Sequence, residues 1–579
     1  MNFDLRYVPF SRYGSYLACS LLARTPGDPP TLWLRQMSGH GQKEVFRLEV
    51  LAEGQPVPFE TVATPSLLEL RSARGSAQGA VQLCIAADDL LRIRGLGAGL
   101  RLSAGDADPF GCAIPWTGER WLVNLFRARR QYMLTPLRGA LRMDAPWQVA
   151  RCAHVVADFL PDPQTGLMEG ALEQFDGAWE PREYPQPFED CLHACQVDFE
   201  RFRQFYPPVP AEYAQAAELA AYVNWASVVS PRGLLKRPAM LMSKNWMTNV
   251  WSWDHCFNAM ALSYGAPDLA WDQMMIIFDQ QQPSGQLPDS INDADVVLNF
   301  VKPPVHGWAL RTMLRASPHI GEAHLAELYP KLARWTDWWF TYRNPDGDGL
   351  PQYHHGNDSG WDNGTAFDAG FPVKGADLAA FLVLQMDVLA EVAGRLGKPA
   401  EAETWQRRAD QLLGALLSRL WRGDRFVSPR AGDGAIAERS DSVFNCLPLV
   451  LGQRLPLPVR RQLVMNLQRY LTPYGPATEH IHSLLYEDDG YWRGPIWAPS
   501  TLLLVDGLRA CGETALAAGV ARRFCDLAKQ SGFAENYNAR TGEPLRDHAY
   551  TWTSSVFLIL AHEYLADEYI ADEYIRAPG

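Results

Sequence analysis

Two acidic residues occupy loops whose neighbours suit acid–base chemistry. Asp362 follows Trp361 in the segment DSGWDN, and a carboxyl group beside an apolar ring can be desolvated enough to raise its pKa, as a general acid needs. Glu535 lies in the segment AENYN, where Asn536 and Tyr537 could orient a carboxylate by hydrogen bonding. Taken alone, Glu535 could equally be a surface acid. Together the two loops suggest a pair of carboxyl groups that exchange protons with a substrate.

Aromatic side chains accompany another acid earlier in the chain. Trp251, Trp253 and Asp254 lie in the segment NVWSWDHCFN, just before a predicted helix. Asp254 could cap that helix. It could instead bind two sugar hydroxyls while an indole ring stacks on the apolar face of the sugar.

Two proline-containing loops follow this helix. Their sequences are GQLPDSIND and FVKPPVHGW, and the side chains that they offer are Gln286, Asp289, His306 and Trp308. These residues would suit the rim of a binding pocket. An ordinary turn explains each loop at least as well.

The segment DDGYWRGPIWAPS holds three aromatic residues and an arginine, too many for an ordinary helix entry. These residues are Tyr491, Trp492, Arg493 and Trp497. Arg493 could lie beside the catalytic base and hold it ionised. Alternatively, Arg493 could pair with an internal carboxylate and lock the loop.

The evidence for metal ions is weak. Asp346 and Asp348, with their neighbouring glycines, resemble part of a calcium loop, but the EF-hand pattern with its terminal Glu is incomplete, and a tight Asp-Gly turn is the preferred interpretation. Cys191 and Cys195 flank His193, yet no second ligand cluster follows, so buried thiols on one helix face are favoured over a zinc site. We therefore expect no metal and no cofactor, with a calcium ion near Asp346 and Asp348 as the minor alternative.

Near residue 200 the sequence pattern of the elements that must position these loops changes from strand-like to helical. Before it, short apolar or alternating runs such as TLWLRQM, VFRLEVL and AVQLCIAA recur between Gly, Pro and Asp. This pattern predicts an N-terminal antiparallel β-sandwich domain which, with a linker, occupies residues 1–200.

The remainder, residues 201–579, reads as helical. Apolar residues recur at i, i+3, i+4 and i+7, as in LAAFLVLQMDVLAEVAGRLG. We predict helices near residues 210–229, 254–264, 267–282, 299–316, 322–343, 375–395, 400–422, 439–451, 457–469, 495–511, 514–530 and 548–567. Twelve helices in six hairpins form an (α/α)6 barrel, and the long loops at one end of such a barrel build its pocket.

Composition and charge narrow the function classes. The chain has 579 residues with 47% hydrophobic and 21% charged residues, which is typical of globular proteins. The formal net charge is −13 and no long basic run occurs, so we expect neither nucleic acid nor a membrane as a partner. The first residues lack the pattern of a signal peptide, which predicts a cytoplasmic protein. The oligomeric state stays open.

In their order along the chain, these segments resemble glycoside hydrolase family 63 and, secondarily, the family 37 trehalases. The resemblance covers about residues 245–560. It rests on Trp253-Asp254, the GQLP and KPP loops, SGWD ending at Asp362, YWRGP beginning at Tyr491, ENYN beginning at Glu535, and AYTWTS with Trp552. SGWD, YWRGP and ENYN in one chain form a specific combination.

The resemblance implies an (α/α)6 barrel and hydrolysis of an α-glycosidic bond with inversion, most directly by an exo-acting α-glucosidase on a short α-glucoside. Asp362 would be the general acid and Glu535 the general base, with their carboxyl groups roughly 6.5–9.5 Å apart so that a water molecule fits. The other candidate residues would bind the small carbohydrate substrate: Trp251, Trp253, Asp254, Gln286, His306, Trp308, Trp361, Asn363, Tyr491, Trp492, Arg493, Trp497, Tyr537 and Trp552.

Several other functions remain open. Inverting glycoside phosphorylases share this domain order but need only one carboxylic acid. Hydrolases of glucosylglycerate or mannosylglycerate resemble the barrel but lack the N-terminal domain, and trehalases differ after SGWD. A non-catalytic sugar-binding protein would not need both carboxylates. An epimerase would use histidine bases, for which His306, His354 and His355 lie in suitable loops.

Overall fold

The protein is described by a computed structural model that covers residues 1–23, 28–39, 41–72, 79–105 and 108–576. The chain forms two compact units. The first comprises Met1–Arg203, Ala221–Arg232 and Ser243–Thr248, and the second comprises Gln204–Ala220, Gly233–Met242 and Asn249–Gly579. Two later segments thus return to the first unit, and a single domain border at residue 200 stays a prediction.

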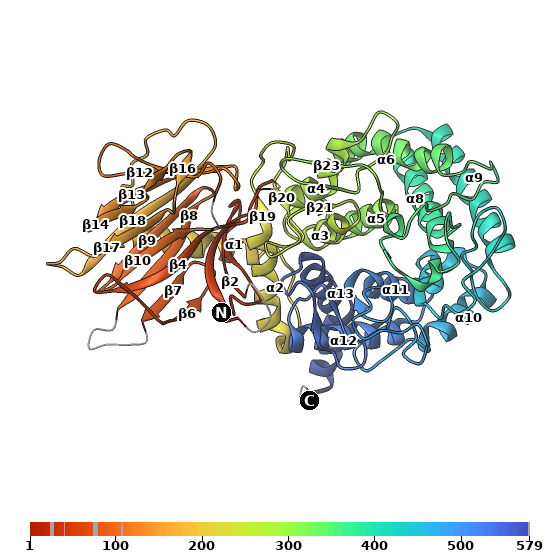
Figure 1. The fold of residues 1–579 in the computed structure, drawn as a ribbon. Helices are drawn as coiled ribbons and strands as arrows, with labels where there is room; N and C mark the ends of the chain where they lie inside the picture. Colours follow the sequence, from red (N-terminus) through yellow and green to blue (C-terminus); the bar gives the residue numbers. More distant parts are fainter. Residues whose placement is uncertain (24–27, 40, 73–78, 106–107, 577–579) are drawn as a thin grey trace. The chain divides into compact units, whose positions relative to one another are not determined.

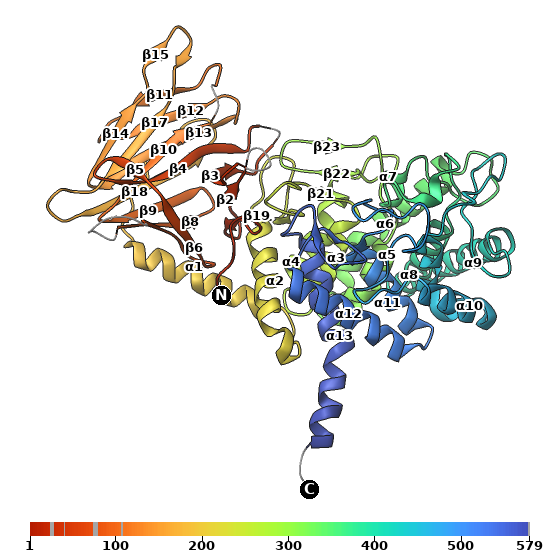
Figure 2. The same ribbon diagram turned by 60° about the horizontal axis from the view of Figure 1, so that its bottom comes forward.

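The first unit contains two antiparallel sheets (Figures 1 and 2). One sheet has the order β1-β2-β3-β4-β10-β17-β14 with β5 beside β4, and the other has the order β11-β12-β13-β18-β9-β8-β7-β6. The strands are β1 Phe10–Ser11, β2 Leu17–Leu22, β3 Thr31–Gln36, β4 Glu44–Ala52, β5 Gln55–Val57, β6 Phe59–Ala63, β7 Leu68–Ser72, β8 Ala80–Ala87, β9 Leu90–Leu96, β10 Gly99–Ala104, β11 Cys112–Pro115, β12 Trp121–Leu125, β13 Arg130–Arg138, β14 Ala140–Asp144, β15 Trp147–Gln148, β16 Arg151–Cys152, β17 Val156–Leu160 and β18 Leu167–Phe175.

Both sheets contribute side chains to one hydrophobic core. Leu48 on β4 lies opposite Leu102 on β10, and both are buried with Leu83 and Ile93 of the other sheet. Because side chains alternate along a strand, the apolar runs in the sequence place one face of each sheet in this core. The predicted antiparallel β-sandwich is confirmed.

Helix α1 (Phe188–Arg203) belongs to the first unit and lies before the first predicted helix. It packs against β8 and buries Cys191 and Cys195, while His193 is exposed. The two thiols therefore lie on one buried helix face, as the sequence predicted. All ten cysteines are free thiols.

The second unit is an (α/α)6 barrel, which confirms the predicted fold. Contacts between consecutive inner helices close a ring in the order α3-α5-α8-η5-α11-α13-α3 (Figure 1). The inner helices are α3 Asp254–Leu262, α5 His306–Ala316, α8 Ala376–Arg395, η5 Val443–Arg454, α11 Ala498–Ala510 and α13 Thr551–Arg576. The outer helices are α4 Pro267–Ile276, α6 Glu322–Tyr342, α9 Pro399–Ala415, α10 Leu457–Gln468 and α12 Thr514–Ser531, together with α2 Ala214–Ser227, of which only Ala214–Ala220 belong to this unit.

Short elements complete the barrel loops. They are η1 Ala211–Tyr213, β19 Val228–Val229, β20 Ala239–Met240, β21 Val250–Trp251, η2 Phe278–Gln280, β22 Ser290–Ile291, β23 Val296–Val297, α7 Gly356–Ser359, η3 Thr365–Phe367, η4 Leu416–Leu420, β24 Ile496–Trp497, β25 Asn536–Tyr537 and β26 Pro544–Leu545. Each of the twelve predicted segments overlaps a helix, although the segment near 439–451 is a 3₁₀ helix with Pro448 inside it.

Two glycines allow the inner helices to approach closely. A Cβ atom on Gly307 of α5 would lie 2.6 Å from the Cα of Gln385 on α8, and one on Gly507 of α11 would lie 2.8 Å from the backbone of Leu449 on η5. Any larger residue would push these helices apart.

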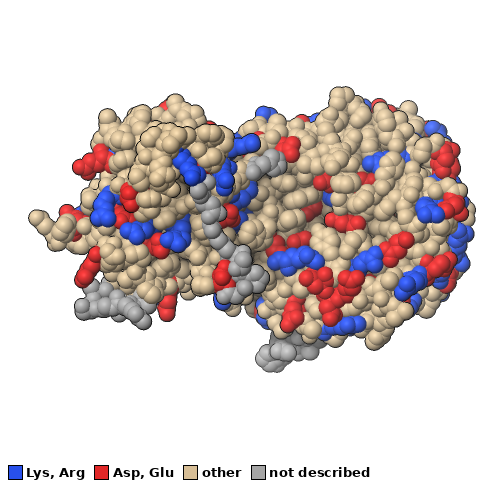
Figure 3. Space-filling model, viewed as in Figure 1, with Lys and Arg blue, Asp and Glu red and all other residues tan. Residues whose placement is uncertain are grey.

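Acidic and basic side chains are interspersed on the face shown in Figure 3. In the described part of the chain, no helix is both long and apolar enough to cross a bilayer.

Candidate active site

The candidate residues lie in loops that lead into inner helices. Outer and inner helices alternate along the chain, so the six inner helices run the same way and their N-termini share one end of the barrel. The loops before α8, α11 and α13 carry Asp362, Tyr491 and Glu535 respectively. The barrel topology therefore brings these three loops to one end.

Glu535 is held beside the loop of Tyr491 by a small sheet. Strand β25 pairs with β24, so that Tyr537 lies opposite Ile496, and the Glu535 amide donates to the Asp547 carbonyl at 2.6 Å. The side chain of Glu535 is only 5% exposed. Burial, together with the nearby Asp547 charge, raises its pKa to about 8, although Arg546 and a hydrogen bond from Tyr491 act in the opposite direction.

Asp362 lies at the end of a tight turn. Gly360 has a φ of 73°, and a Cβ atom there would lie 2.6 Å from the indole of Trp253, so the SGWD turn needs a glycine at this position. The Asn357 amide, oriented with its NH2 group toward Asp362, lies 2.8 and 3.1 Å from the two carboxylate oxygens. Burial raises the pKa of Asp362, while the Lys302 ammonium at 4.0 Å lowers it. A raised pKa suits a general acid.

Asn363 joins the loop of Asp362 to the loop of Tyr491. Its Nδ2 donates to the Gly490 carbonyl at 3.0 Å, and its Oδ1 accepts from the Trp492 amide at 3.0 Å. The oxygen and the NH2 group of the Asn363 side chain are both used within the protein, so Asn363 holds the loop of Asp362 against the loop of Tyr491.

Tyr491 lies where the acids meet. The charges of Glu535, Asp362 and Asp254 all raise the pKa of its hydroxyl, with burial as the larger cause. Its φ is 63°, and Arg546, whose guanidinium lies 4.8 Å from the Tyr491 ring, has a φ of 64°. Left-handed backbone at a non-glycine residue costs about 1–3 kcal/mol and concentrates at functional sites. These strained backbone conformations occur at the two residues that act on Glu535, Tyr491 by a hydrogen bond and Arg546 by its charge.

Five tryptophans surround this point. Trp492 stacks on Trp497 with ring centroids 4.0 Å apart and also contacts Trp361 at 4.7 Å. Trp253 contacts Trp492 at 6.2 Å and Trp552 at 5.7 Å. Among the described residues, the buried Trp552 indole N–H has no hydrogen-bond partner.

Asp254 begins α3 and is buried in the same region. Its Oδ1 accepts from the Tyr550 hydroxyl at 3.3 Å. Burial raises its pKa to about 8, and the charge of Lys302 lowers it. Lys302, from the KPP loop, donates to Asp289 at 2.9 Å and to the Asn357 carbonyl at 2.9 Å. One lysine thus supplies positive charge to three acids of the site, and the sequence alone did not single it out.

Arg493 pairs with an internal carboxylate, which is the second of the two roles that the sequence left open. Its guanidinium pairs with Asp368, and its Nε donates to the Asn363 carbonyl at 2.9 Å. The cation that acts on Glu535 is Arg546 instead. The interpretation that Arg493 holds the base ionised is therefore wrong, because its side chain turns to the loop of Asp362.

Four other predicted residues have different surroundings. His306 lies 3.3 Å from His255 through their Nε2 atoms in the barrel interior, and the Trp308 indole donates to Asp506 at 2.8 Å. The Tyr537 hydroxyl donates to the Gly532 carbonyl at 2.6 Å, so it does not orient Glu535. Gln286 donates to the Leu298 carbonyl at 2.9 Å. These polar groups serve the protein's own packing, whereas Trp251 is half-buried on β21.

The residues considered for metals have protein partners. Lys374 donates to Asp346 at 2.6 Å and also pairs with Asp348, which binds Arg419 as well. In the described part of the chain, one group has metal-ligand spacing: His255, Cys256 and His306 have ligand atoms within 4.8 Å of one another. His255 Nδ1 lies 2.8 Å from the Gln273 carbonyl, so a hydrogen bond between the two histidines explains this group without a metal.

The protonation of Glu535 gives a testable pH dependence. We expect kcat/KM to rise with pH through about 8, because a general base must be ionised and the pKa of Glu535 is raised to about 8. Asp547→Asn removes a charge that raises this pKa, so the rise should move to lower pH. Tyr491→Phe removes a hydrogen bond that lowers it, so the rise should move to higher pH. Profiles in which both variants shift in the same direction would contradict the assignment.

Comparison with known proteins identifies the family. A model of the mannosylglycerate hydrolase MGH1-like glycoside hydrolase domain matches residues 247–553. The chain belongs to this family. It is a glycoside hydrolase, and the resemblance to family 63 is confirmed. The matched residues contain Asp254, Asp362, Tyr491 and Glu535.

Named relatives match a little more than half of this glycoside hydrolase. The mannosylglycerate hydrolase of Rubrobacter radiotolerans is 24% identical over 428 residues, which cover 56% of this chain and 96% of that protein. The glucosylglycerate hydrolase of Mycolicibacterium hassiacum is 21% identical over 410 residues, covering 54% of this chain and 91% of that protein.

Solved structures show the same fold. The family 63 mannosylglycerate hydrolase of Thermus thermophilus in complex with glucose has a TM-score of 0.53 at 22% identity, covering 59% of this chain and 99% of that chain. A bacterial glucoamylase complexed with acarbose has a TM-score of 0.61 at 13% identity and covers 97% of this chain and 94% of that chain. The likeness to glucoamylase therefore extends over both units of this chain.

Proposed function

We propose that this glycoside hydrolase cleaves a small α-glycoside in a single displacement with inversion. The observation that carries the proposal is that three separate loops meet at the loop of Tyr491. Its Trp492 amide donates to Asn363 beside Asp362, its strand β24 pairs with β25 beside Glu535, and Trp253 beside Asp254 contacts Trp492. Carboxyl groups that share one neighbour can face one substrate. Asp362 would protonate the departing oxygen while Glu535 takes a proton from the water molecule whose oxygen bonds to C1.

Three contacts would position the sugar. Asp254 is buried beside Tyr550 and can accept hydrogen bonds from sugar hydroxyls, and the Trp552 indole N–H can donate one. Tyr491 lies between the acids. The stacked tryptophans exclude water around these groups, which strengthens each polar contact with the substrate.

For the substrate we propose mannosylglycerate or glucosylglycerate. Similarity of the catalytic unit to hydrolases with these names supports this class over the short α-glucosides that the sequence favoured. A short α-glucoside remains the second candidate, because the fold likeness to glucoamylase includes the N-terminal unit.

A substrate panel tests this proposal. We expect kcat/KM to be highest for mannosylglycerate or glucosylglycerate, compared with trehalose, maltose and other α-linked disaccharides. Early NMR spectra should show the β-anomer of the released sugar, because inversion at C1 converts an α-glycoside to a β-product. Release of the α-anomer, or strict dependence on added phosphate, would contradict inverting hydrolysis.

A further inference from the structure

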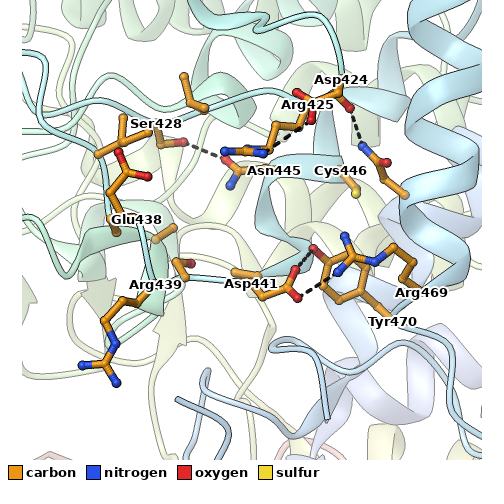
Figure 4. Close-up of a pocket in the computed structure, with 17 residues that line it drawn as sticks. Asp424, Arg425, Ser428, Glu438, Arg439, Asp441, Asn445, Cys446, Arg469 and Tyr470 are labelled. Carbon is orange, nitrogen blue, oxygen red and sulfur yellow. Dashed lines mark hydrogen bonds and ion pairs between the residues drawn. The ribbon is translucent and has the colours of Figure 1, made fainter. Parts of the chain in front are cut away.

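A cavity lies in the barrel unit, beside the loop that leads into the inner helix η5. It has a volume of about 350 Å³ and is lined by residues 424–425, 427–428, 436–442, 445–446, 466 and 469–470, together with Ala366 (Figure 4). Tyr491 and Glu535 are not among its lining residues. The cavity is therefore separate from the candidate active site, and its size lies at the lower end of the range for small-molecule pockets, roughly 300–1,000 Å³.

The charges that line this cavity balance one another. The lining holds three acids and three arginines: Asp424, Glu438, Asp441, Arg425, Arg439 and Arg469. Asp441 accepts from Arg469 at 3.0 Å, and Arg425 donates to Asp424 at 3.4 Å. Because the acids and bases are equal in number and two of the pairs are formed, the wall favours neither an anion nor a cation.

Neutral hydrogen-bonding groups fill the space between these pairs. The Ser428 hydroxyl donates to Asn445 Oδ1 at 3.1 Å, so the NH2 group of Asn445 points away from Ser428. The Tyr470 hydroxyl donates to Asp441 at 2.8 Å and retains an acceptor oxygen. Figure 4 shows these side chains arranged around one space. Alternating donors and acceptors without net charge match the hydroxyl groups of a sugar or similar polyol.

The cavity wall is bonded to the segment that follows the general acid. The hydroxyl oxygens of Thr365 and Ser440 lie 2.7 Å apart, and the Thr365 hydroxyl donates to Glu479 at 2.5 Å. The other oxygen of Glu479 accepts from the Asp441 amide at 3.0 Å. Glu479 is fully buried, so this bridge is protected from water. A ligand held by the wall would thus restrain residues three positions after Asp362.

We propose that this cavity is a second binding site for an uncharged polyol of about one sugar ring, distinct from the site of hydrolysis. The donors and acceptors of Asn445, Ser428 and Tyr470 hold the ligand. Binding orders the cavity wall and, through Thr365, the loop that carries Asp362.

Hydrogen exchange with mass spectrometry tests the site without turnover. With D-glucose or D-mannose as the probe, we expect slower exchange in residues 436–446 and 466–470 of the wild-type chain. Asn445→Leu replaces the amide that would bind the sugar with an apolar side chain and should abolish this protection, while Asn2→Leu, an exposed position in the first unit, should preserve it. Protection confined to peptides that contain Tyr491 and Glu535 would overturn the proposal.

A milder variant separates binding from folding. Ser428→Ala removes one hydroxyl with little change in volume, and loss of one neutral hydrogen bond should weaken sugar binding at this cavity by about 2- to 10-fold. The measurement is the sugar concentration that gives half-maximal protection of residues 436–446. An unchanged half-maximal concentration in Ser428→Ala, together with unchanged protection in a folded Asn445→Leu protein, would also overturn the proposal.

Discussion

Asp362→Asn and Glu535→Gln should each lower kcat by about 10²–10⁴-fold on a natural glycoside, while the chain stays folded. An amide cannot donate the proton that the leaving oxygen needs, nor can it accept the proton of the attacking water. Both amides keep the shape of the acids that they replace. Steady-state rates with the best substrate of the panel measure the effect, and circular dichroism checks the fold.

The leaving group distinguishes the two roles. Fluoride leaves without a proton, so Asp362→Asn should retain most of its activity on an α-glycosyl fluoride, whereas Glu535→Gln should lose activity on both substrates. Asp337→Asn is a matched control, since Asp337 is 53% exposed on α6 and pairs with Arg408 at the surface. Wild-type rates in Asp362→Asn and Glu535→Gln on the natural substrate would refute the site.

Asp358→Asn should destabilise the barrel unit by about 3–5 kcal/mol, because it leaves a buried arginine without its counter-ion. Asp358 is 1% exposed and accepts from Arg343 at 2.9 Å. It also accepts from the amides of His354 at 2.8 Å and Val301 at 3.1 Å. Unlike the partly exposed Asp362, this acid of the DSGWDN segment therefore joins three parts of the chain.

Urea unfolding followed by tryptophan fluorescence measures this loss. Asp337→Asn should stay within about 0.5 kcal/mol of the wild type, as surface changes usually do. If Asp358→Asn fails to fold, Arg343→Met in the same chain should restore part of the stability, because it removes the unpaired buried charge. A stable Asp358→Asn protein with wild-type unfolding would contradict the structural role of Asp358.

Local patterns predicted most of the fold. Apolar spacing along a helix or strand is set by burial of one face, so it is visible in the sequence of each element by itself. Helix α6 shows this, since its buried residues Leu325, Leu328, Leu332, Trp335 and Trp339 recur every three or four positions. Helix α1 was not among the twelve predicted segments, although its two cysteines were assigned to one helix face, because its first three residues are the end of the linker-like segment PREYPQPFED.

The sequence predicted which loops form the site, but it predicted less well which side chains pair with one another there. The motifs indicated Asp362, Glu535, Tyr491 and the tryptophans, which share one region of the barrel. The sequence did not distinguish Arg493 from Arg546 as the partner of the base. Both arginines lie close to an acid in the chain, and only the turn of each loop decides which acid a guanidinium reaches.

By itself, the sequence determined the two structural classes of the chain, the twelve barrel helices and the loops that hold the acids, because these depend on short-range spacing. Only the tertiary structure decided that Asp358 binds Arg343 while Asp362 stays partly exposed, that Lys302 lies near three acids, and that His306 belongs to the interior. These outcomes depend on contacts between loops far apart in the chain. Burial and pairing of a charge are properties of those contacts, and the type of residue alone does not specify them.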